Sequence, residues 1–203
     1  MSKVGFRTKF FKYNMITPSL HRCPWCGTDE LYVEYHDKEW GRQVKDDQTL
    51  FEFLILESAQ AGLSWITILR RREGYRRLFA DFDVHRVAAF TADDVDRIVL
   101  DPAIIRHRGK IEAAIQNAKI FIAIQQEFGS FYTYLYRFMP ENKRLENRRS
   151  SMRDIPVDSE ESKAIAKDLK KRGVKFFGST ICYAYMQAVG MVNDHLLDCD
   201  FRD

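Results

Sequence analysis

Residues 50–62 read LFEFLILESAQAG and form the most informative helical pattern of the chain. Leu50, Leu54 and Glu57 are spaced i, i+4 and i+7, so they share one face of an α-helix. Two aspartates just before the stretch can cap a helix N-terminus, and its final glycine is a good C-terminal stop. The pattern predicts a helix from about residue 46 to 62 that buries an apolar stripe together with Glu57.

Helical signals continue along the chain, whereas strand-like alternation is scarce, so the predicted fold class is all-α. Residues 141–158 are polar and charge-rich without periodicity, which predicts a long surface loop. The arginines of the cluster 70–72 are interpreted as a solvated helix face. Further helices are predicted to begin at Ser64, Thr91 (with Asp94 as a capping box), Gly109, Ser130 and Ser159, and a last one over about 179–189.

The composition suits one globular domain, or one domain with a small lobe. The chain has 203 residues, of which 45% are hydrophobic, and a formal net charge of +3, which permits a nucleic-acid partner without requiring one. No apolar run reaches the length of a membrane span, and residues 1–20 predict a flexible basic extension rather than a secretory signal. We therefore expect no membrane partner, a cytoplasmic location and reduced cysteines, which favours metal binding or burial over disulfides.

Cysteine and histidine residues near both ends of the chain form a candidate metal site. His195 and Cys199 form an H-x3-C pair, whose side chains would share one face of a helical turn. Near the other end lie Cys23, Cys26 and His36. Spacing alone favours Cys23 and Cys26 with the C-terminal pair as zinc ligands, because C-x2-C is a familiar half-site. Two alternatives stay open: His36 in place of Cys26, and unconnected buried cysteines.

Glu57 is a candidate functional residue because it lies on the apolar stripe without a lysine or arginine within helical reach. A desolvated carboxyl needs distant hydrogen bonds or a raised pKa, unless a long-range ion pair or exposure relieves it. Aromatic residues, which belong to the core by default, gather in the same part of the sequence. With one buried acid they would form a pocket for a flat, electron-poor ring such as a methylated purine. These aromatics are Trp25, Tyr32, Tyr35, Trp40 and Trp65.

A basic turn at residues 104–111, IIRHRGKI, joins a short predicted helix to a long one. Arg106, Arg108 and Lys110 bring positive charge to a helix N-terminus, which binds phosphate readily. This arrangement resembles a helix-hairpin-helix, although the turn lacks the usual double glycine.

Several stretches together resemble the 3-methyladenine DNA glycosylase I family. The resemblance runs from about Cys23 to Cys199, with consistent order and spacing. Its motifs are Cys23-x-Trp25, Tyr35-His-Asp-x-Glu-Trp-Gly41, Gln60-Ala-Gly-Leu-Ser-Trp65, Ile104-Ile-Arg-His-Arg-Gly-Lys-Ile111, Lys170-Lys-Arg-Gly173, Thr180-Ile-Cys182 and Val192-Asn-Asp-His195.

The resemblance implies a helix-hairpin-helix DNA glycosylase fold over residues 21–203. A helix-hairpin-helix lobe would cover about 47–140, and a second lobe would come from the N- and C-terminal segments. A structural zinc ion would join those segments through Cys23, His36, His195 and Cys199. Cys26 would then be a bystander, which contradicts the preference from spacing alone.

The resemblance also implies a monofunctional enzyme that removes 3-methyladenine from double-stranded DNA containing alkylated bases, without an obligate protein partner. Glu57 would be the catalytic group, acting through recognition and electrostatic stabilisation. Binding of the base would involve Tyr35 as a second hydrogen-bond partner, Trp65 and Trp25 as stacking rings, and Tyr32 and Trp40 as the wall. Binding of DNA would involve Arg106, Arg108, Gly109, Lys110, Lys171 and Lys175. Rival hypotheses are a non-enzymatic binder of damaged DNA and a zinc-stapled interaction module.

Overall fold

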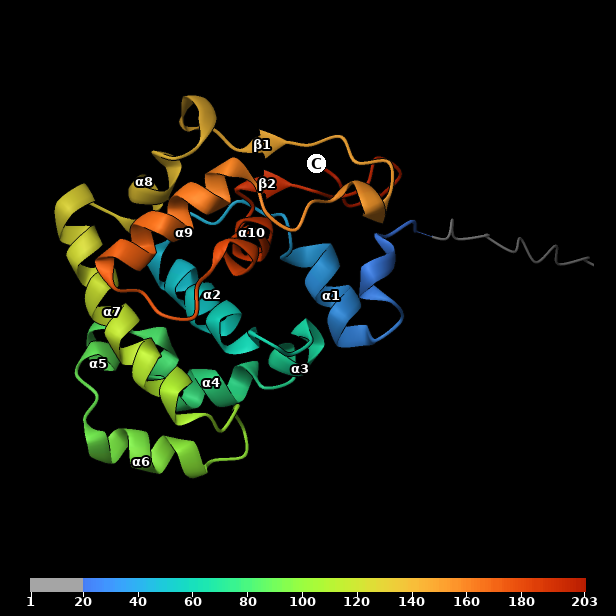
Figure 1. The fold of residues 1–203 in the computed structure, drawn as a ribbon. Helices are drawn as coiled ribbons and strands as arrows, with labels where there is room; N and C mark the ends of the chain where they lie inside the picture. The colour runs from blue at the N-terminus through green and yellow to red at the C-terminus, as the bar shows by residue number, and fades with distance from the viewer. Residues whose placement is uncertain (1–19) are drawn as a thin grey trace, which may run out of the picture.

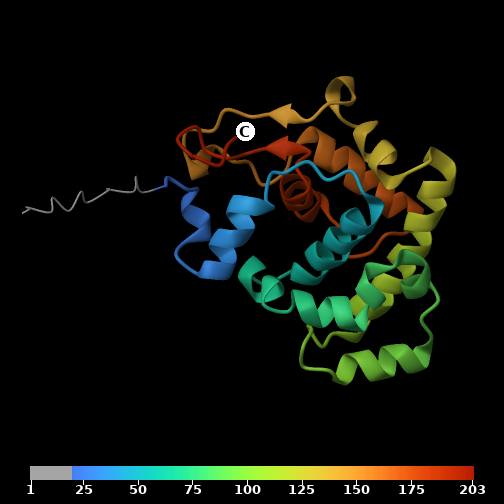
Figure 2. The same cartoon turned by 180° about the vertical axis from the view of Figure 1, so that it is seen from behind.

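The computed structural model describes residues 20–203, so the predicted basic extension lies outside the described residues except for Leu20. Helices dominate the architecture, and the segments from the two ends of the described chain lie side by side (Figure 1; the view from behind is Figure 2). The helices are α1 (Glu30–Lys38), α2 (Asp47–Gln60), α3 (Trp65–Leu69), α4 (Arg72–Leu78), α5 (Val84–Ala88), α6 (Ala92–Leu100), α7 (Arg108–Phe128), α8 (Phe131–Tyr136), α9 (Glu160–Arg172) and α10 (Ser179–Ala188). Short 3-10 turns cover Pro24–Cys26, Ala80–Phe82, Pro140–Asn142 and Met152–Asp154, and two strands cover β1 (Leu145–Glu146) and β2 (Val192–Asn193).

Helix α2 is the centre of the molecule. It begins as predicted, because the Asp46 carboxylate accepts a hydrogen bond from the backbone N–H of Thr49 at 3.0 Å. Every residue from 50 to 59 is buried, so the helix is covered on all sides rather than along one stripe. Helices α3, α7, α8 and α10 supply the cover. A helix that is apolar all round must lie in the core, and Glu57 is buried with it.

Local capping signals predicted several other helices correctly. Thr91 and Asp94 form the predicted capping box of α6. Ser159 caps α9, which ends at Gly173 in the left-handed conformation that glycine adopts at little cost. Each of these bonds joins residues three or four apart, so the sequence pattern contains all the information needed.

The predicted helix after Ser64 and the predicted loop over 141–158 need correction. The first is divided into α3 and α4, and Arg72 is not solvated: it is 9% exposed and its guanidinium bonds to Glu52 and Glu39. The second contains β1, which pairs in parallel with β2, so the all-helical prediction misses a two-stranded sheet. A two-residue strand is too short to show alternation, and its partner lies 47 residues further along the chain.

Ion pairs and hydrogen bonds fix the segments at the two ends of the described chain, and the bond between His21 and Asp200 joins these segments directly. The Arg22 guanidinium contacts Asp37 at 2.8 Å, and Asp200 accepts from the backbone N–H of His21 at 2.7 Å. The Asp203 carboxylate forms an ion pair with the Arg144 guanidinium at 2.8 Å. Within residues 20–203, each helix is too short or too polar to span a lipid bilayer.

Candidate active site and metal centre

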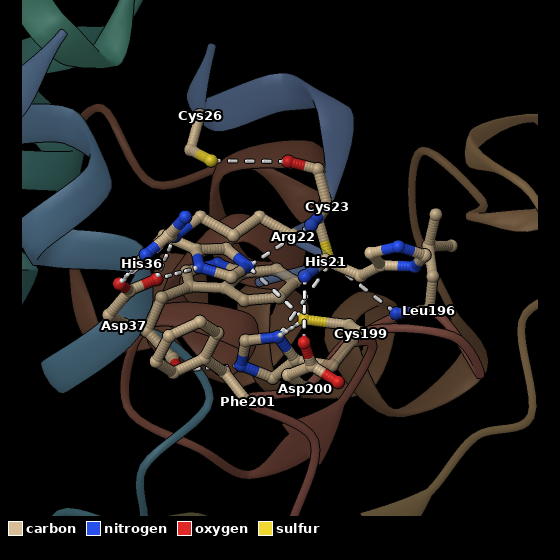
Figure 3. Close-up of polar contacts among 12 residues, drawn as sticks. His21, Arg22, Cys23, Cys26, His36, Asp37, Leu196, Cys199, Asp200 and Phe201 are labelled. Atoms are coloured by element: carbon tan, nitrogen blue, oxygen red, sulfur yellow. Dashed lines mark hydrogen bonds and ion pairs between the residues drawn. The ribbon is translucent and has the colours of Figure 1, made fainter. Parts of the chain in front are cut away.

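Four buried side chains from the two ends of the chain form a cluster of metal-ligand type. Cys23 precedes a 3-10 turn, His36 lies in the last turn of α1, and His195 and Cys199 follow β2. One potential ligand atom from each residue lies within 4.8 Å of all the others. Cys199 Sγ is 3.3 Å from His195 Nδ1 and 3.6 Å from His36 Nε2, and Cys23 Sγ is 3.7 Å from His195 Nδ1 (Figure 3).

The outer nitrogen of each histidine ring is held by the protein. His36 Nδ1 lies 2.8 Å from the Asp37 carboxylate, and His195 Nε2 lies 3.1 Å from the carbonyl oxygen of Trp40. An acceptor on the outer nitrogen fixes the proton there, so the other nitrogen keeps its lone pair for a metal. The inner nitrogens, His36 Nε2 and His195 Nδ1, therefore lie in the cluster as potential ligand atoms, although His36 Nε2 also accepts a 3.4 Å hydrogen bond from the backbone N–H of Cys23.

The donor set fits a tetrahedral metal ion. Metal–sulfur and metal–nitrogen bonds of about 2.3 and 2.05 Å place neighbouring tetrahedral ligand atoms about 3.6 Å apart, close to the distances observed. Burial lowers the pKa of His195 to about 4, which keeps the imidazole neutral, as a ligand must be. Burial raises the pKa of Cys23 to about 12, so its thiolate needs a cation at the cluster. These residues could hold a metal ion.

The structure distinguishes between the ligand sets that spacing left open. Cys26 donates its thiol to the carbonyl oxygen of Cys23 at 3.2 Å and lies outside the cluster, whereas His36 lies within it (Figure 3). The preference from spacing alone was therefore wrong. The prediction of a helical turn for His195 and Cys199 was also wrong, because the segment is an irregular turn closed by a hydrogen bond from Cys199 N to Leu196 O.

A cavity of about 210 Å³ lies beside this cluster, with Glu57 and the predicted aromatic residues around it. Its volume is below the range of drug-sized ligand sites, as suits a single nucleobase. The cavity is lined by Trp25, Tyr32, Tyr35, Trp40, Glu57, Gln60, Trp65, Met152, Ile155, Ala184 and Gln187.

Glu57 is 2% exposed, and its Oε2 atom has no hydrogen-bond partner among residues 20–203. Burial raises the pKa of this carboxyl to about 8, because water no longer stabilises the charged form. The indole N–H groups of Trp25 and Trp65 also lack acceptors within the described chain. Unpaired buried polar atoms are unfavourable, and here three of them belong to residues that line one cavity. A ligand with both donors and acceptors would satisfy them.

The aromatic rings form a connected wall that continues into the cysteine–histidine cluster. Tyr35 and Trp65 have ring centroids 5.5 Å apart, and Trp25 lies 4.9 Å from Trp40 and 5.0 Å from Tyr32. Trp40 also packs edge-on against His195 at 4.7 Å. Because Trp40 contacts both sites, order in the cluster would keep the cavity wall in place.

Five further lining residues were not assigned to the pocket from the sequence. Met152 and Ile155 come from the segment that was predicted to be a long surface loop, and Ala184 and Gln187 come from α10. Gln60 belongs to one of the family motifs, but no contact with the base was predicted for it. Residues 184 and 187 are three apart and therefore share one face of a helix, and this spacing was the sequence signal that could have placed both at the pocket.

The predicted DNA-binding side chains divide into exposed and engaged groups. Arg106, Lys171 and Lys175 are exposed. Arg108 is exposed as well, but it pairs with Asp96, and Gly109 lies in the first turn of α7. The Lys110 ammonium donates to the carbonyl oxygens at the end of α2, those of Ala59 at 2.7 Å and Ala61 at 2.8 Å. The Lys110 ammonium therefore caps the C-terminal end of α2, and two of its N–H groups are used there instead of on a phosphate.

The fold and the site define a helical protein with a base-sized aromatic pocket that contains a buried acid, next to a candidate metal centre. Residues 25–203 match the methyladenine glycosylase family, and the chain belongs to this family. It is 47% identical over 178 residues to a DNA-3-methyladenine glycosylase of Haemophilus influenzae, a match that covers 88% of this chain and 96% of the relative. It is 46% identical to DNA-3-methyladenine glycosylase 1 of Escherichia coli, covering 89% and 96%.

A solved structure has the same fold. The 3-methyladenine DNA glycosylase I of Staphylococcus aureus, in a study of 3-methyladenine recognition, superimposes with a TM-score of 0.86 at 36% identity. The match covers 90% of this chain and 96% of that one. The family resemblance inferred from the motifs is thereby confirmed.

Proposed function

We propose that the protein is a DNA base-excision repair glycosylase that flips 3-methyladenine out of alkylated DNA and removes it by hydrolysis, leaving an abasic site. The observation that carries the proposal is the unpaired, buried carboxyl of Glu57 in an aromatic cavity of the size of a base. The relatives named above, which match over most of their length, support the same reaction.

Recognition would rest on charge and shape. Adenine methylated at N3 in DNA is cationic, so indole and phenol rings attract it more strongly than they attract neutral adenine. Tyr35, Trp25 and Trp65 would contact the ring, with Tyr32 and Trp40 completing the wall, and Glu57 would accept N–H groups of the base. A cation in the cavity also lowers the pKa of Glu57 from about 8, which favours the carboxylate during binding.

Hydrolysis of the cationic nucleotide would need no general acid. The electrons of the bond between C1′ and the base nitrogen pass to the ring, so the base leaves neutral, and water adds at C1′ with loss of a proton. The Glu57 carboxylate would stabilise the positive charge that develops on the sugar. Lysine is absent from the residues that line the cavity within the described chain, so an imine with the sugar and strand cleavage are not expected.

DNA would bind across the connection between α6 and α7, which we interpret as a helix-hairpin-helix without the usual double glycine. Arg106 and the N-terminus of the 21-residue helix α7 would contact one phosphate group, and Lys171 and Lys175 a second stretch of backbone. The hairpin lobe would cover about 47–140, and the cavity would lie between it and the lobe built from the chain ends.

We further propose that the buried cluster holds one structural zinc ion. Cys23, His36, His195 and Cys199 would be its ligands, and the ion would neutralise the thiolates and cross-link the N- and C-terminal segments. With these four side chains as its ligands, the ion would have no position left for water or substrate. Its contribution would therefore be to stability and to the placement of Trp40.

The test is release of free base from methylated DNA. Metal-loaded protein should release 3-methyladenine, detectable by chromatography, and Glu57→Ala should reduce the rate at least about 100-fold, as loss of a transition-state electrostatic contact does. The matched control is Asp93→Ala, which removes an exposed carboxylate in the first turn of α6, outside the cavity and the metal cluster. Binding of lesion DNA without release would contradict the enzyme proposal, and near-normal release by Glu57→Ala would contradict the assigned site.

A further inference from the structure

Phe176, in the connection between α9 and α10, has an unusual conformation and an unusual exposure. Its φ angle is 55°, in the left-handed region, where a bulky side chain is a genuine outlier. The side chain is also 42% exposed. Both features are unfavourable for the isolated protein, so the rest of the fold must impose them, and such residues gather at functional sites.

The neighbours on either side of Phe176 hold it in this conformation. Asn117, fully buried on α7, bonds both backbone groups of Lys175: its Nδ2 donates to the carbonyl at 3.1 Å, and its Oδ1 accepts from the N–H at 2.9 Å. On the other side, Phe177 is buried against Tyr185 with ring centroids 5.4 Å apart. The residues before and after Phe176 are thus both held in place by contacts with other helices.

The ring faces a hollow of about 520 Å³ that is basic and adjoins the base cavity. Lys170 and Lys175 line this hollow and are both exposed. Ala61 and Ile181 line it too. Both residues are close to residues that line the base cavity. Ala61 directly follows Gln60, and Ile181 lies one helical turn before Ala184. The hollow and the cavity therefore share the end of α2 and one face of α10.

The hollow also reaches the predicted DNA-binding turn. The Phe176 ring packs edge-on against His107, the N-cap residue of α7, with centroids 6.0 Å apart. Part of the Phe176 ring is thus in contact with the protein, while the residue as a whole is 42% exposed. An exposed aromatic ring between lysines and a helix N-terminus has the composition of a site for a nucleotide strand.

We propose, as an extension of the function proposed above, that this hollow is a second nucleotide subsite. The Phe176 ring stacks on a base beside the gap that the extruded nucleotide leaves, and Lys170 and Lys175 contact the phosphates of that strand. Stacking is tolerant of sequence, because each base has a π face. The subsite therefore keeps the opened duplex in place whatever base lies next to the lesion.

Binding to a duplex with a single abasic-site analogue tests the subsite without depending on base release. Phe176→Ala and Phe176→Gly should weaken binding about 5- to 150-fold, the range that corresponds to the loss of one stacked base. Phe176→Trp, which keeps an aromatic ring at this position, should bind like the original protein. Glycine adopts a positive φ freely, so Phe176→Gly keeps or improves stability and separates loss of stacking from unfolding. Leu20→Ala, at a side chain that is 53% exposed, is the matched control and should bind like the original protein.

A second set of duplexes identifies the stacked base. Each of these duplexes lacks one base, either a neighbour of the abasic site or the base opposite it. Binding by the original protein should be weaker for the duplex that lacks the stacked base, whereas Phe176→Ala should bind that duplex as well as it binds the others. Equal binding by all Phe176 variants would overturn the subsite, even if the original protein releases 3-methyladenine normally. A protein that releases no base would refute the proposed function alone, because binding of the abasic duplex is measured separately.

Discussion

Replacing Glu57 by glutamine should make the folded protein more stable, and increasingly so as the pH rises. Burial raises the pKa of this carboxyl to about 8, against an ordinary value of 4.5 in the unfolded chain. Between these two values the folded state binds more protons than the unfolded state, so rising pH favours unfolding. Glutamine has nearly the same shape and no charge, and so escapes this penalty.

The magnitude follows from the two pKa values. Their difference of about 3.5 units, at 1.36 kcal/mol per unit, gives a penalty of about 5 kcal/mol once the carboxyl is fully ionised. That is a large part of the stability of an ordinary domain. The advantage of Glu57→Gln should be near zero at pH 4.5, grow by about 1.4 kcal/mol per pH unit, and level off above pH 8.

Urea unfolding of both metal-loaded proteins from pH 5 to 8.5 measures this difference directly. Other titrating groups, including those of the cysteine–histidine cluster, are common to both proteins and cancel. Base release by Glu57→Gln should fall at every pH at which the original enzyme is active, since the variant has no carboxylate for the cationic base. A stability difference that does not change with pH would refute the reasoning, because it would show that Glu57 is solvated or paired in the folded protein.

Three other perturbations have definite expected outcomes. Cys199→Ser should abolish binding of one equivalent of zinc, measured by metal analysis, and lower the melting temperature, whereas Cys26→Ser should leave both unchanged. Arg72→Met should cost about 1–3 kcal/mol in urea unfolding, because Glu52, itself 8% exposed, keeps Arg76 but loses its 2.7 Å bond to Arg72; a variant as stable as the original protein would contradict this. Lys175→Ala should weaken duplex binding regardless of sequence and reduce the slope of log affinity against log salt by about 1; an unchanged slope would remove Lys175 from the phosphate contacts.

Signals between neighbours in the sequence were sufficient for much of the helical framework. Asp46 at the start of α2 and the pair Thr91 and Asp94 at the start of α6 bond to backbone groups three residues away, so their spacing alone predicts the caps. The burial of Glu57 was also predicted, because its helix is apolar along most of its length. In the same helix, periodicity predicted one buried stripe, whereas neighbouring helices cover every side of residues 50–59.

The sequence by itself therefore determined the helical class, the main caps, the residue types of a metal cluster and an acid among aromatics. Residue spacing favoured Cys26 and only the family resemblance implied that His36 meets Cys199, whereas the positions of Met152 at the base cavity and of the exposed Phe176 became known from the packed structure alone. The physical reason is the range of the interactions. Caps and helix faces depend on residues within one turn, whereas these contacts join segments 58 to 163 residues apart, as between Asn117 and Lys175 or His36 and Cys199, and arise only when the helices pack.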